Sequence, residues 1–165
     1  MKTCSKCKES KHLSLFFKHT QTPDGCHSWC KNCCKEGNKK SREKLNSTIE
    51  GRAKVFLVNA KKSALKRNQI FSLTIENIVD CWNKQFGICA YSGRNMVLNA
   101  GQLETVSIER INSSVGYTPE NTILVCQAIN RMKSDFGFEN FYEMCKDVAC
   151  FLGDDDLNLE VLDCK

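Results

Sequence analysis

Long apolar runs are missing from this chain of 165 residues. No stretch approaches the roughly 20 consecutive apolar residues of a membrane-spanning helix, so we expect no membrane partner. The first ten residues, MKTCSKCKES, also lack the apolar region of a secretory signal peptide. We therefore expect an intracellular protein with reduced thiols. Its length suits one domain with a small additional module, and its hydrophobic content of 41% is enough for a buried core.

Histidine is scarce and lies at one end of the chain. His12, His19 and His27 are the only three, so the residues after position 27 hold none. Histidine is the side chain most often used as a general base near neutral pH. Acid–base chemistry carried by the later residues would need another group, or a histidine supplied by the N-terminal segment. We expect surface or loop histidines; the alternative is that His27, beside a cysteine pair, binds a metal or DNA.

Cysteine, by contrast, is abundant, with twelve residues. In an intracellular chain this count favours metal binding over disulfides. Two Cys-x2-Cys pairs stand 22 residues apart, and each would place two thiolates on one side of a tight turn. Together they predict a closed, tetrahedral, structural Zn²⁺ site. Its four ligands are Cys4, Cys7, Cys30 and Cys33.

Cys26 and Cys34 are alternative ligands, although the Cys-x2-Cys spacing favours Cys33 over Cys34. The apolar residues between the pairs are too few for an independent core, so metal binding would supply the free energy of folding. They are Leu13, Leu15, Phe16, Phe17 and Trp29. The remaining thiols are expected to be small buried hydrophobic side chains. They include Cys81, Cys145, Cys150 and Cys164.

Positive charge is concentrated in the first part of the chain. Residues 1–68 hold 17 Lys/Arg and 5 Asp/Glu, whereas residues 69–165 hold 7 and 14, so net charges of +12 and −7 underlie the overall +5. A basic N-terminal part suits a polyanionic partner; the alternative is a solvated lysine-rich surface. The polar connector Lys35–Ser47 fits either a flexible linker or the start of a solvated helix, and it would also suit phosphate contacts.

Hydrophobic periodicity predicts three further helices. Residues 48–68 combine an apolar stripe with a basic face, and the stripe is expected to be buried. The stripe is Val55, Val58, Ala60 and Leu65, and the basic face is Lys54, Lys61, Lys62, Lys66 and Arg67. Residues 74–86 begin with a Thr74 cap and Asn77, end before Gly87, and should bury Ile75, Ile78, Val79, Trp82 and Phe86.

The third helix covers residues 139–152, with Phe141, Met144, Cys145, Val148 and Phe151 on one face. After it, Asp154–Asp156 are expected to form a solvated acidic turn, and the weak alternation of Leu157–Leu162 fits an edge strand. Residues 95–105 are expected to form a loop.

The chain is organised around residues 106–135, VSIERINSSVGYTPENTILVCQAINRMKSD. An apolar run ends in Glu109-Arg110, and a turn-rich loop follows. A second β-rich run, Ile123–Val125, then leads into a helix that starts at Cys126 and extends to Ser134 or Asp135. Two strands crossed by one helix can bring a carboxylate at a strand end and an amide on the helix around one divalent cation.

The ERINSSVGYTPEN…INRMKSD pattern resembles the HNH, or ββα-metal, endonucleases, in the branch whose motif runs DRI…GYTPEN…NRxK. With the upstream cysteines, the arrangement is similar to PacI-type restriction endonucleases. The resemblance covers residues 88–142 well and the first forty loosely. It implies an α+β fold: a zinc module, residues 1–45, followed by a nuclease domain with flanking helices, residues 46–165.

By this resemblance, Glu109 and Asn130 would bind the catalytic divalent cation, Mg²⁺ or Mn²⁺, since hard oxygen ligands suit such ions. Arg110 would contact the scissile phosphate. Asn121 would fix the loop between the strands through backbone hydrogen bonds. Neighbouring phosphates of the DNA would be contacted by Arg131 and Lys133, and by Lys61 and Lys62 on the basic helix.

The sequence departs from the family pattern at three places. Arg110 stands where most members have a histidine base, which makes Tyr117 the candidate base. A free tyrosine, with a pKa near ~10, is a poor base unless positive charge lies beside it. Glu109 replaces the usual aspartate, which moves the carboxylate by about one bond. PacI-type enzymes hold a second zinc with two cysteines in the turn that corresponds to residues 88–93 and two near the final helix. Here Ser92 and Ile129 replace one cysteine of each pair, so Cys89 and Cys126 alone should not form a second zinc site.

The sequence therefore predicts a metal-dependent DNA endonuclease with an N-terminal zinc module that helps to bind DNA. The main alternative is a non-catalytic zinc-containing DNA-binding protein derived from such nucleases, which the missing histidine and Glu109 both favour. A third interpretation is RNA binding through the zinc module. Symmetric cutting of both strands would require a homodimer or two separate events.

Overall fold

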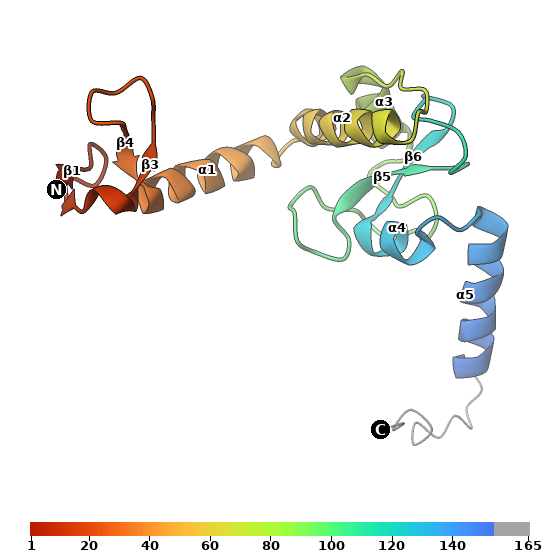
Figure 1. Cartoon of the computed structure of the whole chain (residues 1–165). Helices are drawn as coiled ribbons and strands as arrows, with labels where there is room; N and C mark the ends of the chain where they lie inside the picture. The colour runs from red at the N-terminus through yellow and green to blue at the C-terminus, as the bar shows by residue number, and fades with distance from the viewer. Residues whose placement is uncertain (154–165) are drawn as a thin grey trace.

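The computed structural model describes residues 1–153 and has an α+β architecture (Figure 1). The predicted acidic turn Asp154–Asp156, the edge strand Leu157–Leu162 and Cys164 lie outside the described residues. The N-terminal elements are β1 (Lys2–Thr3), β2 (Ser10–Lys11), the short 3-10 helix η1 (Leu13–Leu15), β3 (Phe16–Lys18) and β4 (Cys26–Cys30). The others are α1 (Lys31–Leu45), α2 (Ile49–Lys66), α3 (Ile75–Lys84), β5 (Val106–Arg110), β6 (Thr122–Cys126), α4 (Gln127–Lys133) and α5 (Phe138–Gly153).

Residues 1–30 fold as two small antiparallel hairpins; together with Cys33 in the first turn of α1 they are here called the cysteine module. β1 pairs with β2, and β3 pairs with β4. The buried centre consists of three cysteines and one aromatic ring: Cys4, Cys30, Cys33 and Phe16. Leu13, Leu15, Phe17 and Trp29 all remain between 37% and 49% exposed. A single buried phenyl ring is far too little apolar surface to stabilise a separate fold.

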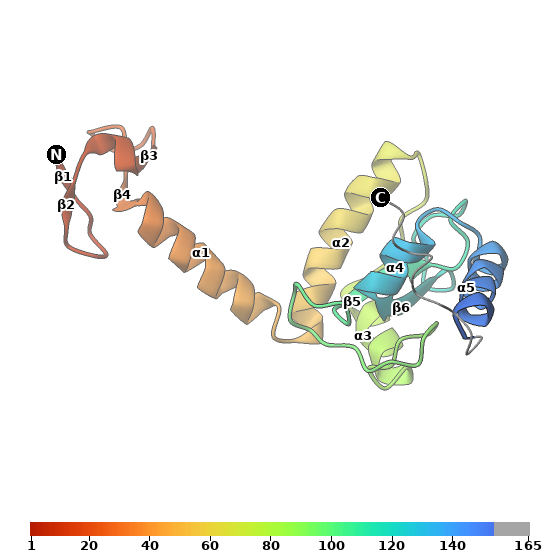
Figure 2. The same ribbon diagram turned by 90° about the horizontal axis from the view of Figure 1, so that it is seen from below.

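The connector after the cysteine module is helical. α1 runs without interruption from β4 to residue 45, which decides between the two conformations left open for residues 35–47. Figures 1 and 2 both show α1 reaching away from the larger part of the chain, with the cysteine module at its far end.

α2 begins as predicted, with the Thr48 hydroxyl accepting a hydrogen bond from the Gly51 N–H, but its buried face is predicted only in part. Ala60 is buried and Val55 is half-buried, whereas Val58 is 55% exposed and Leu65 is 73% exposed. The buried stripe consists of Phe56 and three alanines, Ala53, Ala60 and Ala64. Alanines allow a close helix approach but contribute little to a hydrophobic pattern, so the larger residues shifted the predicted face.

α3 has the predicted Thr74 cap, and Asn77 completes a capping box. Ile78 is buried, and Trp82 packs against the core. Phe86, predicted to be buried, is 85% exposed. The helix ends at Lys84, and Phe86 adopts a positive φ of 53°, so its side chain no longer follows the helical phase.

β5 and β6 form an antiparallel pair in which Glu109 lies opposite Ile123 and Arg110 lies opposite Thr122. α4 follows β6 directly and packs on both strands. These three elements are called the ββα core below. The main hydrophobic cluster joins them to α2 and α3. Cys89 and Cys126 pack inside this cluster, where the Cys126 N–H donates a hydrogen bond to Cys89 Sγ at 3.2 Å.

α5 is a helix, as predicted, and most of its apolar face is exposed. Phe141 is buried, yet Met144, Val148 and Phe151 are 48%, 57% and 67% exposed, and Cys150 is exposed as well. The aromatic contacts of α5 with the described part of the chain lie in its first turns, where Phe138 and Phe141 lie against Tyr91. Within residues 1–153, no helix combines the length and apolar character needed to cross a bilayer.

Candidate metal centre and active site

The four predicted zinc ligands come together in the cysteine module. The sulfur atoms of Cys4, Cys7, Cys30 and Cys33 all lie within 4.8 Å of one another. Four thiolates around Zn²⁺, each about 2.3 Å from the ion, are about 4 Å apart, so this cluster has the size and donor set of a closed zinc site. The cluster can therefore hold a metal such as zinc.

The thiol pKa values show why such a cluster requires a cation. Burial opposes ionisation of Cys4, but N–H groups of Cys7, Cys30 and Lys6 donate to its sulfur and lower its pKa to about 6. Burial, reinforced by the neighbouring sulfurs, raises the pKa of Cys33 to about 12. One thiolate thus forms readily, whereas four adjacent thiolates need a positive ion among them.

Cys34, the competing ligand, lies outside this group. Its sulfur is 3.5 Å from His27 Nδ1 and 3.7 Å from the Trp29 carbonyl oxygen. Burial is the main cause of the raised pKa of its thiol. His27 Nδ1 also accepts a hydrogen bond from the Trp29 N–H at 3.0 Å, and His27 is a half-buried residue of β4.

A second candidate site is a polar cleft of about 490 Å³ between α2, α4 and the ββα strands. Its walls include all four residues expected to carry the chemistry: Glu109, Arg110, Tyr117 and Asn130. Residues separated by more than twenty positions in the sequence therefore share one hollow, because β5, the following loop and α4 meet there.

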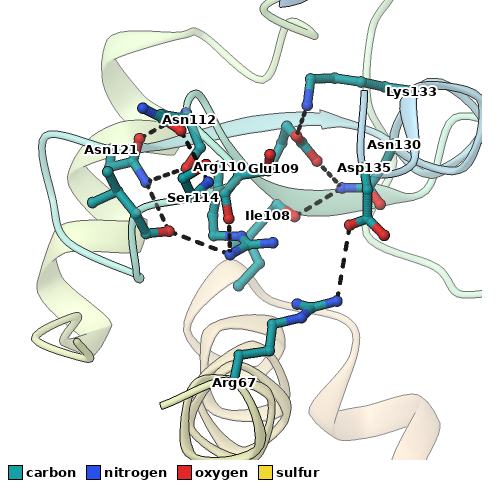
Figure 3. A network of polar contacts seen from close by, with 12 residues as sticks. Arg67, Ile108, Glu109, Arg110, Asn112, Ser114, Asn121, Asn130, Lys133 and Asp135 are labelled. Carbon is teal, nitrogen blue, oxygen red and sulfur yellow. Dashed lines mark hydrogen bonds and ion pairs between the residues drawn. The ribbon is translucent and has the colours of Figure 1, made fainter. Parts of the chain in front are cut away.

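Glu109 and Asn130 are in direct contact (Figure 3). Asn130 Nδ2 donates to Glu109 Oε2 at 2.6 Å and to the Ile108 carbonyl oxygen at 2.9 Å. Glu109 is 7% exposed. The helix that crosses the strand pair thus places its amide against the carboxylate near the end of β5.

Lys133 is the residue whose position differs most from expectation. It was predicted to contact phosphates at the surface, but its side chain is completely buried, so it cannot do so in this structure. Its Nζ lies 2.8 Å from Glu109 Oε1 and forms an ion pair (Figure 3). The contact lacks hydrogen-bonding geometry, and Nζ has no hydrogen-bond acceptor among the described residues. The carboxylate therefore already faces one positive charge.

Arg110 is also buried and holds the loop that follows β5. Its Nη1 donates to the carbonyl oxygens of Ser113 and Val115 at 2.7 and 3.2 Å, and to Gln69 Oε1 at 2.7 Å. The guanidinium lies 5.2 Å from the centre of the Tyr117 ring. Arg110 thus contributes a fixed positive charge to the cleft wall, beside the candidate base.

Asn121 closes the same loop from the other side. Its Nδ2 donates to the carbonyl oxygens of Asn112 and Gly116 at 3.0 and 2.8 Å, and its Oδ1 accepts from the Asn112 N–H at 2.8 Å. Gly116 packs so closely that a Cβ there would lie 1.9 Å from the Ile70 carbonyl oxygen. The Tyr117 N–H donates to that same oxygen, which fixes where the tyrosine enters the cleft.

Sequence reasoning missed the wall of the cleft formed by α2. Ser63 and Arg67, one turn apart, line it, and Arg67 Nη1 donates to Ser63 Oγ at 2.8 Å. Arg67 Nη2 also approaches Asp135 Oδ1 at 3.9 Å across the opening (Figure 3). Ser63 and Arg67 are four residues apart in the sequence, and this i, i+4 spacing was a signal that both side chains lie on the same face of the helix. Arg131 lines the cleft and is exposed, and Lys61 and Lys62 are exposed on α2.

No model of a known protein family matches the chain. Over 100 residues, 61% of its length, the chain is 31% identical to an uncharacterized 29.0 kDa protein of Enterobacteria phage T4. The match covers 39% of that protein, so the chain spans less than half of this relative. A solved structure of the rare-cutting HNH restriction endonuclease PacI aligns over 90% of this chain and 94% of that one, at 17% identity and a TM-score of 0.42.

Proposed function

We propose that this chain is a metal-dependent DNA endonuclease that hydrolyses phosphodiester bonds in the cleft beside Glu109 and Asn130. The observation that carries the proposal is the 2.6 Å contact between these two side chains, from a strand and the helix that crosses it. The HNH-like motif in residues 109–135 supports the same assignment. The division into residues 1–45 and 46–165 is part of this proposal.

A single divalent cation fits the donor set of the cleft. The buried Glu109 carboxylate already attracts one cation, the Lys133 ammonium, and Mg²⁺ or Mn²⁺ is often held by one or two protein oxygens with water and substrate phosphate. Asn130 turns its NH₂ group toward Glu109, so its amide would have to rotate for its oxygen to become a ligand. When bound, the cation would neutralise charge on the phosphate and assist departure of the 3′ oxygen.

The protein groups have separate tasks in this proposal. Arg110, held by loop carbonyls, presents a positive charge to the scissile phosphate without having to be ordered when substrate binds. Tyr117 is the proposed base for the attacking water. Arg131, Lys61 and Lys62 would contact phosphates farther along the DNA. One cleft cuts one strand, so cutting both strands would need two copies of the chain or two events.

A non-catalytic DNA-binding protein with a structural zinc is the second candidate. The specific observation in its favour is that Glu109 is satisfied by Asn130 and Lys133, an arrangement that is complete without a metal ion. In this case the cleft would only stabilise the ββα core.

The test is incubation of the purified protein with supercoiled plasmid and Mg²⁺ or Mn²⁺. We expect nicking or linearisation, strongly reduced by Tyr117→Phe, which removes only a hydroxyl. The metal-site control is Glu109→Gln combined with Lys133→Met, which leaves no buried charge unpaired, compared with Lys133→Met alone, in which the Glu109 carboxylate keeps its hydrogen bond to Asn130. Absence of cutting in either metal would reject the endonuclease, and equal cutting by every variant would indicate a contaminating nuclease.

A further inference from the structure

α1 is a helix that lacks a packing partner along most of its length. Of its fifteen residues, only Cys33 at the N-terminal end is buried. Its neighbours in the fold are β4 at one end and α2 at the other, and toward the α2 end Lys39, Arg42 and Glu43 also line a pocket with Asn99 and Ala100. A helix that is polar all round is usually found bridging two parts of a structure through solvent.

This helix carries a large positive charge that the described residues do not neutralise. Its sequence, KNCCKEGNKKSREKL, holds six Lys/Arg and two Glu. Its one ion pair within residues 1–153, Lys39 with Glu43, has a separation of 3.9 Å and both side chains are exposed, so it contributes little. Five of the six basic residues are exposed: Lys35, Lys39, Lys40, Arg42 and Lys44.

Both ends of α1 are anchored. The four-cysteine cluster fixes the N-terminal end, because Cys30 is the N-cap and Cys33 lies in the first turn. At the other end, the Leu45 carbonyl oxygen packs against α2 so closely that a Cβ on Gly51 would lie 1.7 Å from it.

The junction with α2 is also tied to the ββα core. Asn46 is buried, and its Oδ1 accepts from Arg52 Nη1 at 3.4 Å. Arg52 Nη2 donates to the Val106 carbonyl oxygen, at the start of β5, at 3.0 Å. The direction of α1 is therefore set relative to the strand that carries Glu109.

We propose that α1 is a rigid basic arm that binds the phosphate backbone of a DNA duplex outside the cleft; this rests on the proposed function. At about 1.5 Å per residue, fifteen residues span about 22 Å, the length of roughly six or seven base pairs. The arm would fix the register of the duplex without reading its sequence. A duplex fits better than single-stranded RNA, because α1 has no aromatic residue on which an unpaired base could stack.

The test compares two variants that each lose three positive charges. The arm variant is Lys39→Ala/Lys40→Ala/Arg42→Ala, and the matched control is Lys84→Ala/Arg94→Ala/Lys146→Ala, three exposed residues outside the arm. Alanine favours helices, so the arm should stay folded; unchanged circular dichroism and zinc content would verify this. Fluorescence anisotropy measures affinity for a labelled duplex of about 30 base pairs, with Ca²⁺ replacing Mg²⁺, between about 50 and 200 mM salt.

We expect the arm variant to bind at least about tenfold more weakly, and the slope of log K against log salt to become shallower by about 2 to 3, since each phosphate contact contributes about 0.9. The control should change the slope by less than about 0.5. Equal losses in the two variants would overturn the proposal, because they would reflect net charge alone. A loss seen with RNA and not with duplex DNA would overturn the DNA assignment.

The plasmid assay separates this proposal from the endonuclease. If no protein cuts DNA but only the arm variant loses affinity, the endonuclease fails and the arm stands. If the native chain cuts DNA while both variants bind equally well, the arm fails and the endonuclease stands.

Discussion

Replacing Glu109 by alanine would leave the fully buried Lys133 ammonium without its counterion. The two groups are 2.8 Å apart, and no other ion-pair partner of Lys133 occurs within residues 1–153. Removing one member of a buried ion pair typically costs about 3–5 kcal/mol. Since a small domain is stable by only about 5–15 kcal/mol, we expect Glu109→Ala to be close to unfolding. Loss of DNA cutting by this variant alone would therefore say nothing about chemistry.

A second substitution should restore much of that stability. Lys133→Met alone leaves Glu109 hydrogen-bonded to Asn130, and we expect it to cost about 1–3 kcal/mol. The double variant Glu109→Ala/Lys133→Met buries no charge. We expect it to be more stable than Glu109→Ala by about 2 kcal/mol; added to the cost of about 1–3 kcal/mol of Lys133→Met alone, this is a coupling of about 3–5 kcal/mol between the two side chains.

Urea unfolding measures these differences. Trp82 packs against the core and Trp29 lies in the cysteine module, and they are the only two tryptophans. In a Trp29→Phe background, fluorescence therefore reports the ββα core, and similar slopes with urea would show that the same surface unfolds in each variant. If the double variant loses at least the sum of the two single losses, Glu109 and Lys133 are not coupled and the reasoning fails.

Three further predictions concern the metal sites and the junction. Lys133→Met should bind Mn²⁺ at least about tenfold more tightly than the native chain, because the substitution removes a positive charge that repels the ion. An electron paramagnetic resonance titration measures the affinity, and an unchanged affinity would contradict the prediction. Zn²⁺ must displace the protons of the four thiols, most easily that of Cys4, whose pKa is lowered to about 6 from 9.0. The zinc affinity of the module, and with it the free energy of unfolding reported by Trp29 fluorescence, should therefore decrease as the pH falls from about 9 through 6; a constant value would contradict the assignment. Gly51→Ala should displace α1 or lower the melting temperature, because the added Cβ would lie 1.7 Å from the Leu45 carbonyl oxygen. The control is Gly93→Ala: the Cβ position there is open, so this variant tests only the strain of a positive φ.

The elements of the ββα core could be predicted because local signals agreed there. The β-rich runs were bounded by turn residues, and outside this core the Thr74 cap of α3 could likewise be predicted from the sequence. The Cys-x2-Cys spacing similarly selected four thiols that the structure brings within 4.8 Å. In each case the residues that decide the structure are neighbours in the sequence or share a fixed spacing.

The buried faces of the helices were harder to predict, because they depend on partners far away in the chain. The stripe of α2 follows Ala53, Ala60 and Ala64, whose small size allows a close approach that no hydrophobic pattern rewards. α5 shows the opposite case: Met144, Val148 and Phe151 form a regular apolar face, yet they remain exposed. Periodicity gives the phase of a helix, but only the tertiary fold decides which face is covered.

Lys133 shows why the charge state of the cleft could not be read from the motif. A lysine two residues after an exposed arginine on a short helix looks like part of a phosphate-binding surface. On α4, however, positions 131 and 133 point in directions about 200° apart around the helix axis. Arg131 lies at the opening of the cleft, whereas Lys133 lies at its buried inner end. There the ammonium meets the carboxylate expected to hold a metal ion. Any divalent cation in this cleft must therefore bind beside a fixed positive charge, so its affinity should depend strongly on the added negative charge of a substrate phosphate.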